Sequence, residues 1–151
     1  MSVLGPLDVT PVLARLSAQV PELTTVGGVL EYALALRKPP KACPAAYVVR
    51  AAERGAGVQP ASMIASNKVT VSFSVCLAFA PDFALSFTQQ DQALTTIENK
   101  VREALCGWRI PGVTGTNYAI EFVQSAISGL DEQTIWIKCE FLTGYHQRYN
   151  L

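Results

Sequence analysis

The sequence is short of the residues that catalysis needs. Its 151 residues contain a single histidine, His146, which lies in a polar stretch near the C-terminus. General acid–base and nucleophilic catalysis require titratable groups within reach of one another, so this histidine is poorly placed for either. Asp131 and Glu132 are adjacent in a predicted turn, where aspartate is favoured because its side chain hydrogen-bonds to the backbone. The sequence therefore predicts a protein that is not an enzyme.

Spacings typical of metal and phosphate sites are also missing. The cysteines are far apart, form no CxxC pair and have no histidine nearby to complete a zinc site. The glycine-containing segment 112–116 has no lysine to reach a phosphate. We therefore expect no cofactor and no metal. We interpret all four cysteines as small apolar residues of a reduced cytosolic chain: Cys43, Cys76, Cys106 and Cys139.

Charge is sparse and balanced. Charged residues make up 16% of the chain, below the usual quarter or so, and half of the residues are hydrophobic. Twelve basic and twelve acidic side chains cancel without forming a basic stripe, which argues against tight binding to nucleic acid. The sequence shows neither a signal peptide nor an apolar run of membrane-spanning length, so no membrane partner is expected. A thinly charged surface favours contact with other subunits.

Alternating residues from Asn67 to Ala80 predict one unusually long strand. Apolar side chains occupy every second position and polar ones lie between them, which is the period of a strand that buries one face. Strands of this length usually serve an architecture, and none of the residues described above suggests an active site. The combination favours an assembly component. The apolar positions are Val69, Val71, Phe73, Val75, Leu77 and Phe79.

The remaining segments predict an α+β protein. Helices are expected over residues 10–20, 29–36 and, with the clearest apolar periodicity, 88–105. Strands are expected over residues 45–51, 118–127 and 134–145, of which the last two form a hairpin. With the long strand, they give a single domain over residues 1–151. We expect a mostly antiparallel four-stranded sheet packed by one long helix and two short N-terminal helices.

Two segments are predicted to lack regular structure. The composition of residues 53–66 favours a mobile loop, which is either an ordinary hairpin tip or an arm that orders against a neighbouring subunit. A polar C-terminal tail is expected over residues 145–151, where aromatic residues and arginine match the composition of interfaces, although tails are often disordered. The candidate subunit-interface residues in these segments are Arg54, Gln59, Met63, Tyr145, Arg148 and Tyr149.

Two tryptophans and their neighbours complete the candidate interface. Trp108 and Arg109 follow the long helix directly, and the indole either anchors a partner or, as we favour, plugs the end of the core beneath the helix. Trp136 and Leu142 are exceptions on the otherwise polar face of the last strand. We expect the short helices or a partner to cover part of that face.

Several local sequences and their order carry a resemblance that spans nearly the whole chain. A helix ends in Val-Pro-Glu-Leu at residues 20–23, and a proline-led strand follows at residues 44–49. A gapped loop precedes the long strand, the long helix closes in Gly-Trp-Arg-Ile-Pro at residues 107–111, and a last strand occupies residues 136–145. In these features the chain resembles the tail terminator proteins of long-tailed bacteriophages and related minor tail and tail-completion proteins.

The resemblance implies a structural virion protein without catalytic residues or cofactor. Tail terminators form a ring, commonly a hexamer, on the last ring of the tail tube, where they end polymerisation and face the head. The implied partners are therefore further copies of the chain, the tail tube protein and the head–tail connector or stopper. DNA would pass through the lumen without specific binding. Assembly would take place in the host cytoplasm, and the ring would lie at the head-proximal end of the tail.

Other classes of protein stay open. One is another ring protein of the same particle, either a head–tail stopper or a tail tube subunit, and a tube subunit would polymerise into long cylinders. Another is a small bacterial binding or regulatory domain unconnected with phage, although the sequence shows no ligand pocket. The state of self-assembly separates these alternatives, and an enzyme is a distant third.

Overall fold

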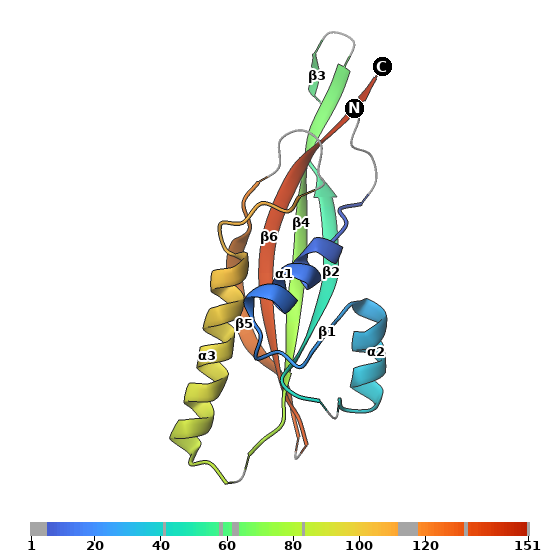
Figure 1. Cartoon of the computed structure of the whole chain (residues 1–151). Coiled ribbons are helices and arrows are strands. Elements are labelled where there is room, and N and C mark those ends of the chain that lie inside the picture. Colours follow the sequence, from blue (N-terminus) through green and yellow to red (C-terminus); the bar gives the residue numbers. More distant parts are fainter. Residues whose placement is uncertain are drawn as a thin grey trace.

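The computed structural model is an elongated α+β molecule built around one sheet (Figure 1). It describes residues 6–40, 42–57, 59–61, 64–82, 84–111, 118–131 and 133–150. The helices within these ranges are α1 (Thr10–Gln19), α2 (Val29–Arg37) and α3 (Phe87–Leu105). The strands are β1 (Thr25–Gly27), β2 (Ala45–Gly55), β3 (Gln59–Ala61), β4 (Ile64–Phe79), β5 (Glu121–Leu130) and β6 (Ile135–Asn150).

The sheet has the strand order β1-β2-β4-β6-β5, and β3 pairs with the beginning of β4. The long strands β4 and β6 form its antiparallel centre, in register from Ile64 opposite Asn150 to Phe79 opposite Ile135. The α+β class is confirmed, and each of the four predicted strands is present as β2, β4, β5 and β6. The sheet nevertheless has more strands than the four that were predicted. β1 and β3 are additional, and β1 runs parallel to β2. Strands of three residues are too short to show an alternating pattern.

Strands also occupy most of the two segments predicted to lack regular structure. β2 continues to Gly55, while β3 and the start of β4 lie within residues 59–66. β6 continues to Asn150 through the predicted tail. Ladder hydrogen bonds come from the backbone, so a strand outside the core needs no apolar alternation. The loop and tail predictions were therefore wrong in secondary structure, and the mobility of residues 53–66 stays a prediction. Met63 lies outside the described residues.

The predicted helices are confirmed, with ends that follow from local chemistry. α1 has proline in its first turn, where a missing N–H costs no hydrogen bond. α3 begins at a capping box: the Ser86 hydroxyl accepts from the Gln89 backbone N–H at 3.2 Å, and the Gln89 side chain accepts from the Ser86 N–H at 3.0 Å. These reciprocal bonds satisfy backbone donors that the helix itself leaves unpaired.

The main core lies on one face of the sheet, beneath α1 and α3. Phe73 of β4 and Phe141 of β6 stack at its centre with ring centroids 5.5 Å apart, and neither side chain is exposed. The two helices are linked because Arg15 of α1 donates to the backbone carbonyl of Ala104 in α3. The alternating apolar residues of the long strand all belong to this core, as predicted.

A smaller cluster lies on the opposite face, where α2 covers the sheet. The ring of Trp136 meets the ring of Tyr32 edge to face at 5.6 Å and lies 6.0 Å from that of Tyr47. The expectation that a short helix covers part of this face is confirmed. α2 therefore stands apart from α1 and α3, and Figure 1 shows it on the side of the molecule away from α3.

Candidate assembly surfaces

Two of the predicted interface residues are buried within the chain itself. The side chain of Trp136 is only 8% exposed, and Tyr145 lies against the main core. The Tyr145 hydroxyl donates to Glu53 Oε1 at 2.9 Å, and the same carboxylate lies 3.3 Å from the Arg50 guanidinium. Both aromatic residues hold parts of one chain together, so in the single chain their side chains are not exposed for contact with a partner. Sequence composition could not show this burial, because it depends on distant segments.

The environment of Tyr145 predicts a loss of stability in alkaline solution. Burial, with a smaller effect of Glu53, raises the pKa of Tyr145 to about 12, above the value near 10 of an unfolded tyrosine. Because the folded pKa is the higher one, the resulting stability is present below about pH 10 and is lost as the pH rises towards 12.

We expect Tyr145→Phe to lower the free energy of unfolding by about 1–2 kcal/mol at pH 7, since a hydrogen bond to a carboxylate is lost. The variant should then lose less further stability than the wild type between pH 10 and 12. Urea titrations across this range measure both effects. Equal pH dependence of the two proteins would contradict the assigned role of the hydroxyl.

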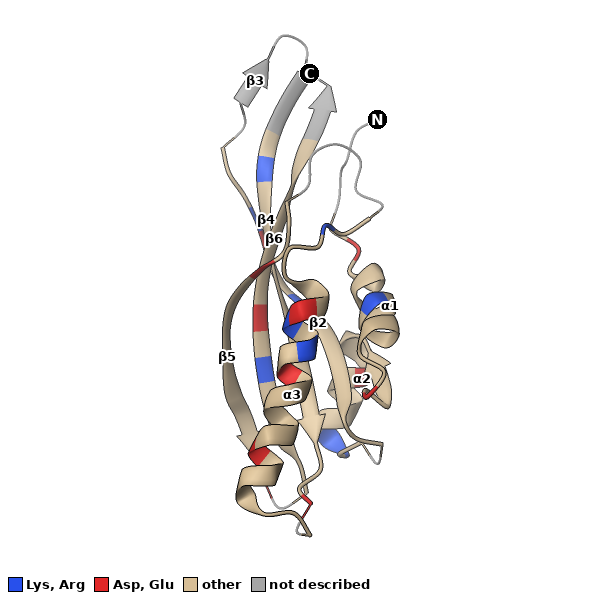
Figure 2. Ribbon diagram, turned by 60° about the vertical axis from the view of Figure 1, so that its left-hand side comes forward, with Lys and Arg blue, Asp and Glu red and all other residues tan. Residues whose placement is uncertain are grey.

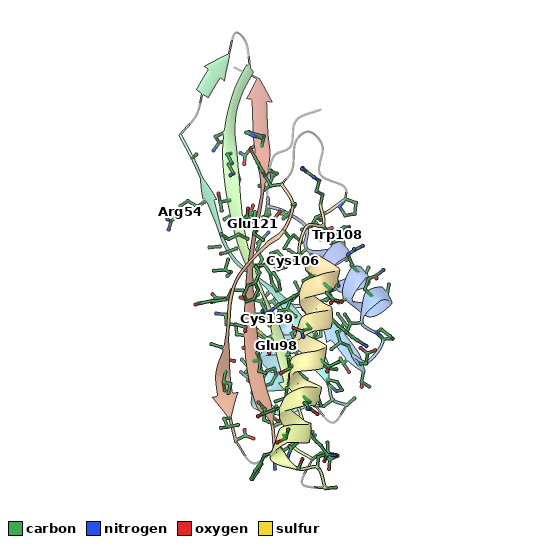
Figure 3. All side chains as sticks on the ribbon, turned by 90° about the vertical axis from the view of Figure 1, so that its left-hand side faces the viewer. Arg54, Glu98, Cys106, Trp108, Glu121 and Cys139 are labelled. Atoms are coloured by element: carbon green, nitrogen blue, oxygen red, sulfur yellow. The ribbon has the colours of Figure 1, made fainter. Side chains whose placement is uncertain are left out.

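Trp108 sits at the end of the core, and its environment favours the plug interpretation. The indole is half-buried against the core, and the Arg15 guanidinium lies 4.7 Å from its ring centroid. Its backbone N–H donates to Leu105 at 3.1 Å, and its carbonyl accepts from the Ile120 N–H at 2.9 Å. Figure 3 shows Trp108 at the C-terminal end of α3. Arg109 follows it with an exposed side chain.

The remaining candidates lie along the long strands. Arg54 is exposed and projects from β2 away from the body of the molecule (Figure 3), and Leu142 is half-buried on β6. Gln59 lies in β3, and residues 148 and 149 lie in β6. Arg148 and Tyr149 were predicted for an interface, and their backbone pairs with β4. The structure thus spreads the predicted residues over the molecule and does not bring them together.

Two exposed apolar surfaces were not among the predicted sites. The first, here the α2 patch, projects from the outer side of α2 and consists of Val29, Leu30, Leu34 and Leu36. The second, here the β5 patch, lies on the edge strand of the sheet and consists of Val123, Ile127 and Leu130. The leucine-rich composition of α2 was visible in the sequence, but which of its sides remains uncovered was not.

A shallow apolar pocket of about 410 Å³ lies beneath the N-terminal half of α3. Its walls include Leu94 and Ile97 of α3, Phe79 of β4, and Pro44, which directly precedes β2. Phe87, at the first position of α3, does not line this pocket and is 89% exposed. The lining carries few polar groups and no paired titratable residues, so it suits an apolar side chain better than a reacting substrate.

The cysteines occupy different environments. Cys76 and Cys139 are buried as small core residues, whereas Cys43 is half-buried and Cys106 is exposed. All four are free thiols, in line with their interpretation as residues of a reduced chain, although Cys106, which follows the last turn of α3, is not in an apolar environment. Burial raises the pKa of Cys139 to about 12, and nearby Glu98 adds to the effect. Figure 3 shows Glu98 and Cys139 side by side between α3 and β6.

The titratable groups form no recognisable catalytic arrangement within the described part of the chain. His146 lies on β6, where its Nε2 is 2.9 Å from the Tyr118 hydroxyl. In the described ranges, no three histidine, cysteine or acidic side chains are close enough to hold a metal ion. Nor does any helix there have both the length and the apolar character needed to cross a membrane.

Comparisons with known proteins agree with the resemblance seen in the sequence. A solved structure described as the virion of a native gene transfer agent particle contains a chain that superimposes with a TM-score of 0.56 and 16% sequence identity. The match covers 88% of this chain and 90% of the other, and at this identity it establishes the fold alone. No curated protein matches by sequence. The family model of the phage tail terminator protein, however, matches residues 2–150. The chain therefore belongs to the phage tail terminator family and is a structural protein of a phage tail.

Proposed function

We propose that copies of this chain form a ring, commonly a hexamer in this family, that caps the tail tube and ends its polymerisation. The observation that carries the proposal is the family match over residues 2–150. Two further features support it. The α2 patch and the β5 patch expose apolar side chains of the kind that subunit contacts bury. The long β4–β6 pair provides a rigid frame on which such contacts can be held in place.

On this proposal, one side of the ring contacts the tail tube protein and the other contacts the head–tail connector or stopper. DNA passes through the lumen without specific binding, in keeping with the balanced charge of the chain. The ring then sits at the head-proximal end of the tail and is assembled in the host cytoplasm. The hairpin formed by β3 and the start of β4, which includes Gln59, is proposed to contact a neighbouring subunit or ring together with Arg54 of β2.

Purified protein mixed with preformed tail tubes tests the function directly. We expect negative-stain images to show added density at one end of each tube, and we expect tube growth from added tube subunits to stop at that end. Bovine serum albumin at the same concentration serves as the inert control. Long cylinders formed by this chain alone would identify a tube subunit instead. A monomer that neither assembles nor binds tubes would refute the proposed function.

A further inference from the structure

A ring of more than two members needs two different surfaces on each copy, a requirement that rests on the function proposed above. An isologous contact uses one surface twice and stops at a dimer, whereas a heterologous contact joins two different surfaces and can close into a ring. In the described ranges, the α2 patch and the β5 patch are two such separate apolar surfaces. Whether they suit each other depends on their shape, position and charge.

The α2 patch is the uncovered side of a packed helix. Ala35 and Tyr32 hold α2 against the sheet, where Tyr32 packs on Tyr47 and Trp136. Leu30 and Leu34 are one helical turn apart on the other side and are 68% and 59% exposed. Two leucines at this spacing form a ridge that a neighbouring surface can bury. No other part of the chain that the structure describes covers this ridge.

Two residues of the β5 patch, Ile127 and Leu130, project from the core face of the sheet beyond the cover of α3. Ile127 pairs with Ile137, and Leu130 pairs with Ile135, so both side chains lie on the same face as the main core. They are nevertheless 65% and 70% exposed. The register of β5 shifts at two places, and such irregularities oppose the docking of a further long strand. This edge therefore offers side chains for contact more than it offers backbone hydrogen bonds.

The two patches lie on opposite sides of the molecule and at a similar level along its length. The strand order places β1 and β2, which α2 contacts, at one edge and β5 at the other. In Figure 1, α2 stands on the side away from α3 and β5. In Figure 2, α2 and the arrowhead end of β5 both lie in the lower half of the molecule. Rotation about an axis roughly parallel to the strands would therefore bring unlike patches together.

One end of each patch carries charges of opposite sign to those at the other patch, while each patch also has one residue of the other sign nearby: Glu31 in α2, and Arg102, which donates to Ser125 of β5. Arg37 and Lys38 are exposed at the C-terminal end of α2. Asp131 directly follows the β5 patch, and the exposed Asp91 lies two helical turns before Glu98, on the side of α3 that approaches β6. Figure 2 shows blue residues at the foot of α2 and red residues on the lower part of α3. Opposite charges at the rims favour correct alignment of two apolar surfaces.

We propose that the α2 patch of one copy packs against the β5 patch of the next copy. Leu30 and Leu34 contact Ile127 and Leu130, while Arg37 and Lys38 face the acidic residues at the other rim. The contact is heterologous, so each copy uses both patches and the chain of contacts closes into the ring.

The test uses two full-length variants that each block one patch. Leu34→Asp leaves the β5 patch intact, and Ile127→Asp leaves the α2 patch intact. By analytical ultracentrifugation, we expect wild-type rings, monomers of each variant alone, and a dimer of twice the chain mass in an equimolar mixture. Phe87→Asp alters an exposed apolar residue outside both patches and should still form rings. The changed side chains are exposed, so we expect every variant to be folded. Circular dichroism melting curves check this expectation.

Cross-linking detects the mixed dimer even if it is too weak to be seen by ultracentrifugation. Leu34→Cys and Ile127→Cys are prepared separately in a Cys106→Ser background, which removes the exposed native thiol. A short bismaleimide should link the mixed pair but neither protein with itself. Rings that persist in either Asp variant, an unlinked mixture, or a wild type without self-association would overturn the proposed contact. A ring that fails to cap tail tubes would instead refute the proposed function and leave the contact intact.

Discussion

Replacing Phe141 by alanine is expected to lower the free energy of unfolding by about 3–5 kcal/mol, which is the usual cost of removing a fully buried phenylalanine. Phe141 is unexposed at the centre of β6, stacked on Phe73 at 5.5 Å and in edge contact with Phe122 at 5.9 Å. Its removal leaves a cavity in the core that the sheet forms with α1 and α3. A loss of this size is a large part of the stability of a small domain.

Urea unfolding followed by circular dichroism measures this effect. Phe87→Ala is the matched control, because it deletes the same side chain at a position that is 89% exposed, and it should change stability by less than about 0.5 kcal/mol. If both variants lost similar stability, the assignment of Phe141 to the centre of the core would be wrong.

The second large effect is expected for Trp136→Ala, which should lower the free energy of unfolding by about 3 kcal/mol and weaken the packing of α2 on the sheet. The indole packs on Tyr32 of α2 and Tyr47 of β2, and it lies over Gly129, where an added Cβ would come within 3.3 Å of Trp136 Cδ1. Removing it takes away the surface on which α2 rests. We therefore expect faster tryptic cleavage after Arg37 together with the lower unfolding midpoint in urea.

Leu142→Ala is the control for this variant, because Leu142 lies on the same strand and face but is only half-buried. Leu142→Ala should lower the free energy of unfolding by about 1 kcal/mol or less and leave the rate of tryptic cleavage after Arg37 unchanged. If Trp136→Ala kept wild-type stability but no longer formed rings, the result would indicate that Trp136 contacts a neighbouring subunit directly. Loss of both stability and rings is expected, since α2 carries one of the proposed contact surfaces.

Phe141 and Trp136 show which features of the fold a local sequence pattern can predict and which it cannot. Alternation along the long strand placed Phe73 in the core, and Phe141 lies opposite it on the last strand. The pattern also put Trp136 on the opposite face, but an exposed interface and an internal cluster have the same local signature. The difference depends on α2, which is distant in sequence and packs there through Tyr32 and Ala35.

Tyr145 shows the same limit at the C-terminal end of the chain. Polar neighbours suggested a tail, whereas β6 continues to Asn150 because β4 provides a backbone partner along its whole length. The buried hydroxyl of Tyr145 then meets Glu53, which is 92 residues away in the chain. No local pattern encodes a contact at that separation. The β5 patch was missed for a related reason, since Ile127 and Leu130 adjoin a segment with the composition of a turn.

The periodicities of the amino-acid sequence are sufficient to predict the helices, the long strands and the α+β class, and its local motifs carry the resemblance to phage tail terminators. These properties are local, because side-chain spacing along a few turns or residues decides which face is apolar. Which apolar surfaces are covered by other parts of the chain follows from the packing of the helices on the sheet. Trp136 and Tyr145 became internal, while the α2 patch and the β5 patch stayed exposed. Burial depends on the packing of segments that are distant in sequence. The surfaces that this packing leaves uncovered are the ones available for contact with other subunits.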